Sequence, residues 1–98
     1  MALRLAPRAI ADLDDIWDHV FVESGSEASA DRAIDLIEVR FTTLSDWPRI
    51  GRQRDDLRSG YRSYTAGEYL IFYRMDGDDV VIQRVLHGRR DLRRLLDP

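Results

Sequence analysis

One histidine and several arginines in the second half of the chain are the side chains best suited to act on a phosphate group. His87 is a candidate general acid or base, because an imidazole changes its charge near neutral pH. Arg84 stands three residues before it, and Arg62 and Arg74 lie in segments expected to form neighbouring strands. Phosphodiester cleavage needs an acid–base group and cations that hold the phosphate as its charge grows, so these four residues form a candidate catalytic set. A structural or binding role for His87 is the preferred interpretation, because short motifs often match by chance.

A second candidate site lies in the acidic stretch near the start of the chain. Asp14 and Asp18 are four residues apart, and the same spacing separates Asp15 from His19. Each pair would share one face of a helix, which is compatible with a metal site. The alternative is a solvated polar face, including Asp12, whose carboxylates lie near the positive end of the helix dipole. We expect this second alternative, and predict no metal site and no cofactor.

The elements that position these residues must come from a single small domain. The chain has 98 residues, 44% of them hydrophobic, which suits one core spanning residues 1–98. Without cysteine it can have no disulfide framework, thiolate zinc site or cysteine nucleophile. The start lacks the apolar segment of a signal peptide, and no apolar run reaches the roughly 18 residues of a membrane span. We therefore predict a soluble cytoplasmic protein that does not bind membranes.

Charge is distributed unevenly along the chain. Residues 1–48 carry four Arg against ten Asp and Glu, a net charge of −6, whereas residues 49–98 carry 11 Arg against eight acids, a net charge of +3. All 15 basic residues are arginine, whose planar guanidinium can bind a phosphate or carboxylate through two hydrogen bonds. We therefore expect a basic partner-binding surface in the second half.

Apolar spacing predicts two helices after a short first strand. Alternation favours a strand over residues 3–5, and a helical pattern begins at Arg8. The predicted buried stripe of the first helix comprises Ile10, Leu13, Ile16, Trp17, Val20 and Phe21. Ser26 is a candidate N-cap for the second helix, which should end at Trp47 because a proline follows. Its predicted buried stripe comprises Ala30, Ala33, Ile34, Ile37, Phe41 and Leu44.

The remaining residues predict a loop, three strands and a short terminal helix. Residues 48–60 lack apolar periodicity and form the expected loop, whose length is more typical of functional loops. Aromatic and β-branched residues predict strands over 61–65, 69–74 and 80–87, separated by turn residues. The predicted fold is α+β, with two layers: a helical hairpin packed on an antiparallel sheet in the order β-α-α-β-β-β, followed by a short C-terminal helix. The opposite face of the sheet is expected to be partly open.

Four segments carry a resemblance to a known family: ADLDDIW at 11–17, WPRIGRQRDDLRSGYRSY at 47–64, YLIFYR at 69–74 and RVLHGRRDL at 84–92. In this order and combination they resemble toxins of the ParE/RelE superfamily, also known as plasmid stabilisation proteins, and in particular the ParE branch. The resemblance covers essentially the whole chain. It implies the same β-α-α-β-β-β layout that periodicity predicts.

The resemblance implies the toxin component of a type II toxin–antitoxin system. ParE-like toxins inhibit DNA gyrase by trapping its cleaved DNA complex, and a ParD-like antitoxin of the ribbon-helix-helix type neutralises them and brings the complex to DNA. RelE-like relatives instead cut messenger RNA on the ribosome. The alternatives are therefore an endoribonuclease that uses His87, Arg84, Arg62 and Arg74, or an inactive toxin that serves only as antitoxin partner and co-repressor. Fold alone does not separate these activities, and a gyrase-binding toxin without enzymatic activity is preferred.

The partner-binding surface is expected where arginines meet the apolar strip of the terminal helix. Arginines can contact an acidic antitoxin segment, or gyrase and its DNA, and the resemblance places the antitoxin on or beside the leucine strip. The predicted partner-binding residues are Arg58, Arg62, Arg84, Arg89, Arg90, Leu92, Arg93, Leu95 and Leu96. We also expect the isolated chain to expose apolar surface.

Overall fold

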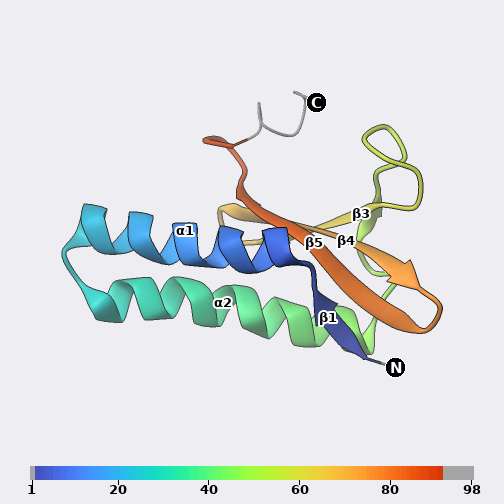
Figure 1. Cartoon of the computed structure of the whole chain (residues 1–98), viewed down its shortest axis with the longest axis horizontal. Helices are drawn as coiled ribbons and strands as arrows, with labels where there is room; N and C mark the ends of the chain where they lie inside the picture. Colours follow the sequence, from blue (N-terminus) through green and yellow to red (C-terminus); the bar gives the residue numbers. More distant parts are fainter. Residues whose placement is uncertain (1, 92–98) are drawn as a thin grey trace.

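A helical hairpin packs on one face of a five-stranded sheet in the computed structural model, which describes residues 2–91 (Figure 1). The elements are β1 (Leu3–Leu5), α1 (Pro7–Ser24), α2 (Glu27–Asp46), β2 (Arg52–Gln53), β3 (Arg62–Ala66), β4 (Tyr69–Asp76) and β5 (Asp79–His87). The α+β class and the two-layer arrangement are confirmed. Most of the predicted terminal helix lies outside the described residues.

The sheet differs from the prediction in two respects. Its strand order is β1-β5-β4-β3-β2, and β1 pairs with β5 in parallel, so the sheet is mixed rather than purely antiparallel. No hairpin joins these two strands, and the sequence therefore carried no signal for their relative direction. The second difference is β2, a two-residue strand inside the predicted loop, which pairs Arg52 with Ser63 of β3. Both residues of β2 are exposed, so no apolar alternation marks this strand.

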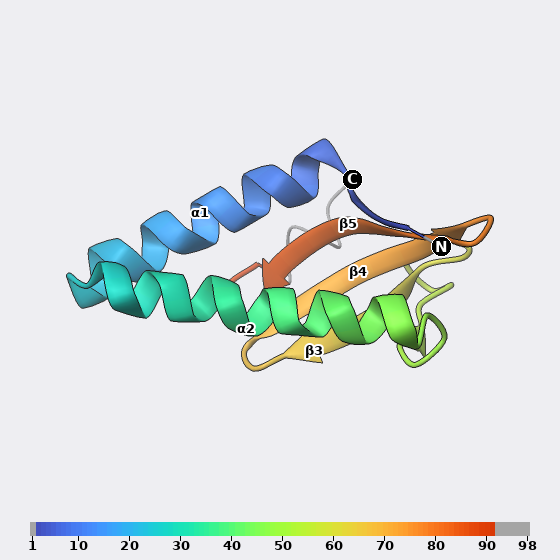
Figure 2. The same ribbon diagram turned by 90° about the horizontal axis from the view of Figure 1, so that it is seen from below.

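The short connection between the helices makes them antiparallel neighbours (Figure 2). At the end of α1, Gly25 adopts a left-handed conformation with φ 67° and donates its N–H to the carbonyl of Phe21. A residue with a side chain would be strained there. The predicted N-cap is confirmed, because the Ser26 hydroxyl accepts a hydrogen bond from the N–H of Ser29.

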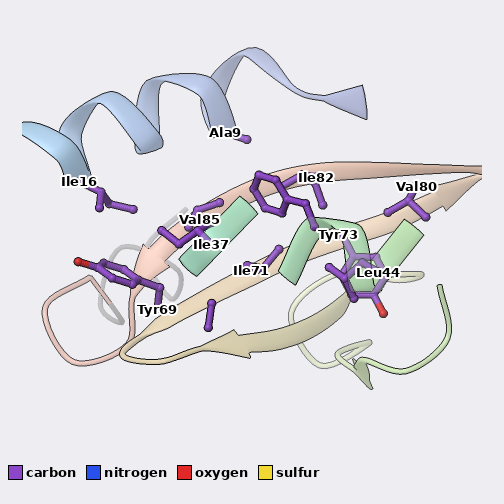
Figure 3. Close-up of a cluster of buried hydrophobic side chains, with 12 residues drawn as sticks. Ala9, Ile16, Ile37, Leu44, Tyr69, Ile71, Tyr73, Val80, Ile82 and Val85 are labelled. Carbon is purple, nitrogen blue, oxygen red and sulfur yellow. The ribbon is translucent and has the colours of Figure 1, made fainter. Parts of the chain in front are cut away.

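The core lies between the two helices and the sheet face they cover (Figure 3). The predicted stripe of α2 is confirmed at its centre, where Ala30, Ile37, Phe41 and Leu44 are buried. Ile71 and Tyr73 of β4 meet them from the sheet. Tertiary packing thus selects the face of α2 that its periodicity predicts.

The buried face of α1 agrees with the middle of the predicted stripe, where Ile16 is buried and Leu13 and Val20 pack partly buried against the core, and differs from it at the two ends. Ala9, Asp12 and Ile16 are buried, whereas Ile10 is 51% exposed and Phe21 is 37% exposed. Apolar residues extend around so much of this helix that periodicity alone permits more than one buried face. The hydrogen bond between the Asp12 carboxylate and the N–H of Val85 in β5 fixes which of these faces of α1 lies against the sheet.

The sheet face away from the helices is not open at its centre. Phe72, Val81 and Leu86 lie outside the helix-facing core, yet each is at most 5% exposed. The Arg54 guanidinium lies 5.9 Å from the centroid of the Phe72 ring. The expectation of a partly open face is therefore wrong for these residues, because groups of the chain itself cover them. The large apolar residues that are exposed in the described part of the chain are Ile10, Phe21, Val22, Leu36, Val39, Trp47 and Ile50.

No helix within residues 2–91 is long and apolar enough to cross a membrane.

Candidate functional site

A buried ion pair joins α1 to the edge of β5. Asp12 is only 8% exposed, and its carboxylate accepts hydrogen bonds from Nε and Nη2 of Arg84 at 2.8 and 3.0 Å. It also accepts the backbone N–H of Val85 at 2.9 Å. The expectation that Asp12 lies on a solvated polar face is wrong. The register between β1 and β5 explains why Asp12 is buried. β1 pairs with β5 only up to Ile82, so the later residues of β5 have no neighbouring strand on the β1 side. The carboxylate satisfies an N–H that a longer β1 would otherwise bind.

The guanidinium of Arg84 therefore has a structural partner, the Asp12 carboxylate. The hydrogen bond to Asp12 raises the pKa of the Arg84 guanidinium above its usual value. Its side chain is mostly buried, and two of its N–H groups point at the same carboxylate. Binding a phosphate there would require breaking this pair.

His87 uses the Nδ1 atom of its imidazole to stabilise a turn. Its Nδ1 accepts the backbone N–H groups of Arg89 and Arg90 at 3.3 and 3.0 Å. The ring packs edge-on against Tyr69, and Nε2 lies 3.5 Å from a carboxylate oxygen of Glu68. The lone pair of Nδ1 is therefore directed at the backbone N–H groups of this turn. His87 is thus held by its neighbours as a turn residue.

The turn after His87 also closes the free edge of β5. The Asp91 carboxylate accepts the backbone N–H of His87 at 3.0 Å, and the N–H of Asp91 donates to the carbonyl of His87. Two carboxylates, those of Asp12 and Asp91, therefore cap successive outward N–H groups of this edge. Such capping prevents the edge from pairing with another strand.

The turn after α2 is anchored to the sheet by Tyr73. The Tyr73 hydroxyl donates to the carbonyl of Pro48 at 2.8 Å and accepts the N–H of Gly51 at 2.9 Å. Burial raises the pKa of this hydroxyl. A Cβ on Gly51 would overlap Tyr73 and lie 2.8 Å from the carbonyl oxygen of Ser63, so only glycine fits.

Arg62 completes this anchor. Its Nη1 donates to the carbonyls of Gly51 and Arg49 at 2.9 and 3.2 Å. Like Arg84, it uses its guanidinium inside the fold. Sequence reasoning missed the roles of Gly51 and Tyr73, because a tyrosine in an apolar strand gives no sign of the carbonyl that it binds. The proline–glycine spacing of the loop was the only available signal.

The candidate catalytic residues are not brought together. Arg62 lies opposite Tyr73 in the sheet and so faces the helices, whereas Arg84 lies opposite Phe72 on the other face. Arg74 pairs with Val81, which also puts it on the face away from the helices. The four candidates therefore do not converge on one position where a phosphate could sit.

Several other arginines are ion-paired at the surface. Arg4 binds Asp76 at 2.6 Å and lowers the pKa of that carboxyl, and Arg54 has the same effect on Asp56 at 3.2 Å. Arg90 lies 3.3 Å from Asp91.

The predicted partner-binding residues differ in their exposure and in the interactions they make. Arg62, Arg84 and Arg90 are engaged as described, Arg58 is exposed with its guanidinium 6.0 Å from the Tyr61 ring, and Arg89 is exposed. The remaining four, Leu92, Arg93, Leu95 and Leu96, lie outside the described residues.

A hollow of about 500 Å³ lies between α1 and the capped end of β5. Its lining residues are Asp12, Asp15, Ile16, His19, Val85, Leu86, Arg90 and Asp91. The Nε2 of His19 lies 3.0 Å from a carboxylate oxygen of Glu23 rather than pairing with Asp15.

The chain is similar to known toxins over most of its length. The family model described as "ParE toxin of type II toxin-antitoxin system, parDE" matches residues 3–92. Toxin ParE3 of Caulobacter vibrioides is 41% identical over 81 residues, covering 83% of this chain and 80% of the relative. Toxin ParE1 of the same organism is 40% identical over 90 residues, covering 92% of each. A solved structure of the "Chromosomal ParDE TA system from P. aeruginosa" superposes with a TM-score of 0.78 at 28% identity, covering 89% of this chain and 95% of that one. The chain therefore belongs to the ParE toxin family of type II toxin–antitoxin systems.

Proposed function

We propose that this toxin acts by binding rather than by catalysis, and that its target is DNA gyrase. The observation that supports this is the engagement of three of the four nuclease candidates within the fold. Arg84 binds Asp12, Arg62 binds two backbone carbonyls, and the Nδ1 of His87 accepts two backbone N–H groups. A ribonuclease needs its acid–base group and its cations free and close together. The gyrase target itself is inferred from the family.

We further propose that a ParD-like antitoxin of the ribbon-helix-helix type holds the toxin inactive in the cytoplasm and links it indirectly to DNA. The exposed apolar residues of the helical layer support a protein partner, since Val22, Val39 and Leu36 are exposed there. The similar solved structure is that of a ParDE system, which also supports such a partner. Arg58 and Arg89, which are exposed, remain proposed partner contacts, as do Leu92, Arg93, Leu95 and Leu96.

Expression in a bacterial host without antitoxin tests the proposal. Growth should stop, and purified toxin should cause gyrase-dependent DNA breaks, whereas primer extension on translated messages should find no new cleavage. Co-expression of the ParD-like antitoxin should restore growth. Unimpaired growth at confirmed toxin levels would indicate the inactive co-repressor instead.

A variant separates the nuclease alternative. His87→Ala should still stop growth and still cause gyrase-dependent breaks, because the imidazole supports a turn. If this variant lost killing together with cleavage of ribosome-bound messages, the ribonuclease would be the correct function and the gyrase proposal would be wrong.

A further inference from the structure

The turn that follows α2 presents an exposed tryptophan on a rigid support. The N–H of Ile50 donates to the carbonyl of Trp47 at 3.0 Å, which closes a tight turn with Trp47 and Ile50 at its two ends. Trp47 is 68% exposed and Ile50 is 49% exposed. The Tyr73 hydroxyl holds the backbone of this turn, so its side chains project from a fixed position. Large exposed aromatic rings on a fixed backbone are typical of recognition sites.

The same turn carries two arginines that form no close ion pair with a carboxylate of residues 2–91. Residues 47–54 contain three Arg and no acid. Arg54 is paired with Asp56, and the charge of Arg52 also helps to lower the pKa of that carboxyl. No carboxylate of residues 2–91 lies within ion-pair distance of Arg49 or Arg52. Both are exposed, and the guanidinium of Arg62 adds a further positive charge under the turn. Two exposed guanidinium groups that form no close ion pair within residues 2–91 therefore accompany the exposed indole in this turn.

The rest of the surface restricts where a polyanion can approach. The helical layer contains most of the acids of residues 1–48, whose net charge is −6. A chain of phosphates would be repelled there and attracted to the turn after α2. An indole face can stack on any unpaired base, and neighbouring guanidinium groups can bind the adjoining phosphates. An acidic peptide could use the two guanidinium groups but would leave the indole face without a planar partner.

We propose that the turn from Trp47 to Arg52 binds single-stranded nucleic acid, with a base stacked on Trp47 and phosphates bound by Arg49 and Arg52. The site lies apart from the Asp12–Arg84 pair and from the hollow beside it. Nucleic-acid binding by this turn does not require gyrase to be the target, so a test of this proposal is independent of the proposed function.

Fluorescence anisotropy of labelled dT12 with the full chain, purified free of antitoxin, tests the proposal. The parent should bind saturably at low salt, and Trp47→Ala should weaken binding about fivefold or more, the effect of losing one stacked base. Arg49→Gln combined with Arg52→Gln should reduce the slope of log affinity against log salt by about 1.4, since each phosphate contact contributes about 0.7. The matched control is Arg8→Gln with Arg32→Gln, which removes two charges from the helical layer and should leave the slope unchanged. A parallel titration with rU12 identifies which nucleic acid is bound more tightly.

Tryptophan fluorescence locates the contact. The Trp17 indole donates to Asp31 at 2.9 Å and stacks on Phe21, away from the turn, so Trp17→Phe leaves Trp47 as the only indole. Adding dT12 to this variant should quench its emission. Absence of saturable binding, an unchanged affinity in Trp47→Ala, or quenching by polyglutamate but not by dT12 would each overturn the proposal, and the last would assign the turn to an acidic protein segment.

Discussion

Replacing Asp12 by alanine removes the acceptor that holds both Arg84 and the free edge of β5. Three hydrogen bonds are lost: two from the guanidinium and one from the N–H of Val85. The cavity left by a carboxylate is small, so the main effect is electrostatic. Arg84 keeps its charge, and its largely buried side chain would lose the carboxylate to which it is hydrogen-bonded, leaving Asp91 as a more distant negative charge.

The expected loss is about 3–5 kcal/mol of unfolding free energy. Breaking a buried ion pair by removing one partner costs about that much, and an unsatisfied buried N–H alone costs about 1–3 kcal/mol. Solvent reaches part of the Arg84 side chain, which favours the lower half of the range. Because domains of this size have a total stability of roughly 5–15 kcal/mol, the variant should be near the limit of folding.

Urea unfolding followed by circular dichroism measures this loss. Asp15→Ala is the matched control, since Asp15 is an exposed carboxylate one turn further along α1, and it should change stability by less than about 0.5 kcal/mol. Replacing both partners, by Asp12→Leu with Arg84→Met, should recover much of the loss because no unpaired charge remains. The reasoning is refuted if Asp12→Ala and Asp15→Ala unfold at the same urea concentration, or if the double variant is no more stable than Asp12→Ala.

Three further predictions concern the turn after α2 and His87. Tyr73→Phe should lose about 1–3 kcal/mol at neutral pH, because the carbonyl of Pro48 and the N–H of Gly51 lose their partner. Burial raises the pKa of Tyr73, so the unfolded chain releases this proton first and the parent loses stability as the pH rises above about 10. Tyr73→Phe should show a smaller alkaline loss than Tyr64→Phe in urea titrations over that range, and equal losses would contradict the assignment. Gly51→Ala should lower stability by about 1–3 kcal/mol through overpacking, measured as a fall in Tm, and an unchanged Tm would mean the turn can move. His87→Ala should lower Tm without abolishing growth arrest in cells without antitoxin, and loss of growth arrest in a folded variant would show a functional role for the imidazole.

The candidate site illustrates where sequence reasoning reached its limit. Residue type singled out Arg84, Arg62 and His87 as candidates, but it did not indicate what each of them binds in the fold, and it placed Asp12 on a solvated face. An aspartate in an acidic helical stretch is usually solvated, and nothing near it in sequence reveals the partner 72 residues away. Nothing near Trp47 in the sequence indicates that its turn is held in place, because the hydroxyl that holds this turn comes from Tyr73, 25 residues beyond Pro48.

The amino-acid pattern by itself determined the two helices, their cap at Ser26, the three later strands and the family, because these depend on local periodicity, turn residues and ordered motifs. Only the tertiary structure decided the parallel pairing of β1 with β5, the burial of Asp12 on α1 and the hydrogen bonds of the arginines. Each of these depends on where a strand ends relative to a distant neighbour. Because β1 stops opposite Ile82, the N–H of Val85 needs an acceptor, and the Asp12 carboxylate that accepts it also binds Arg84.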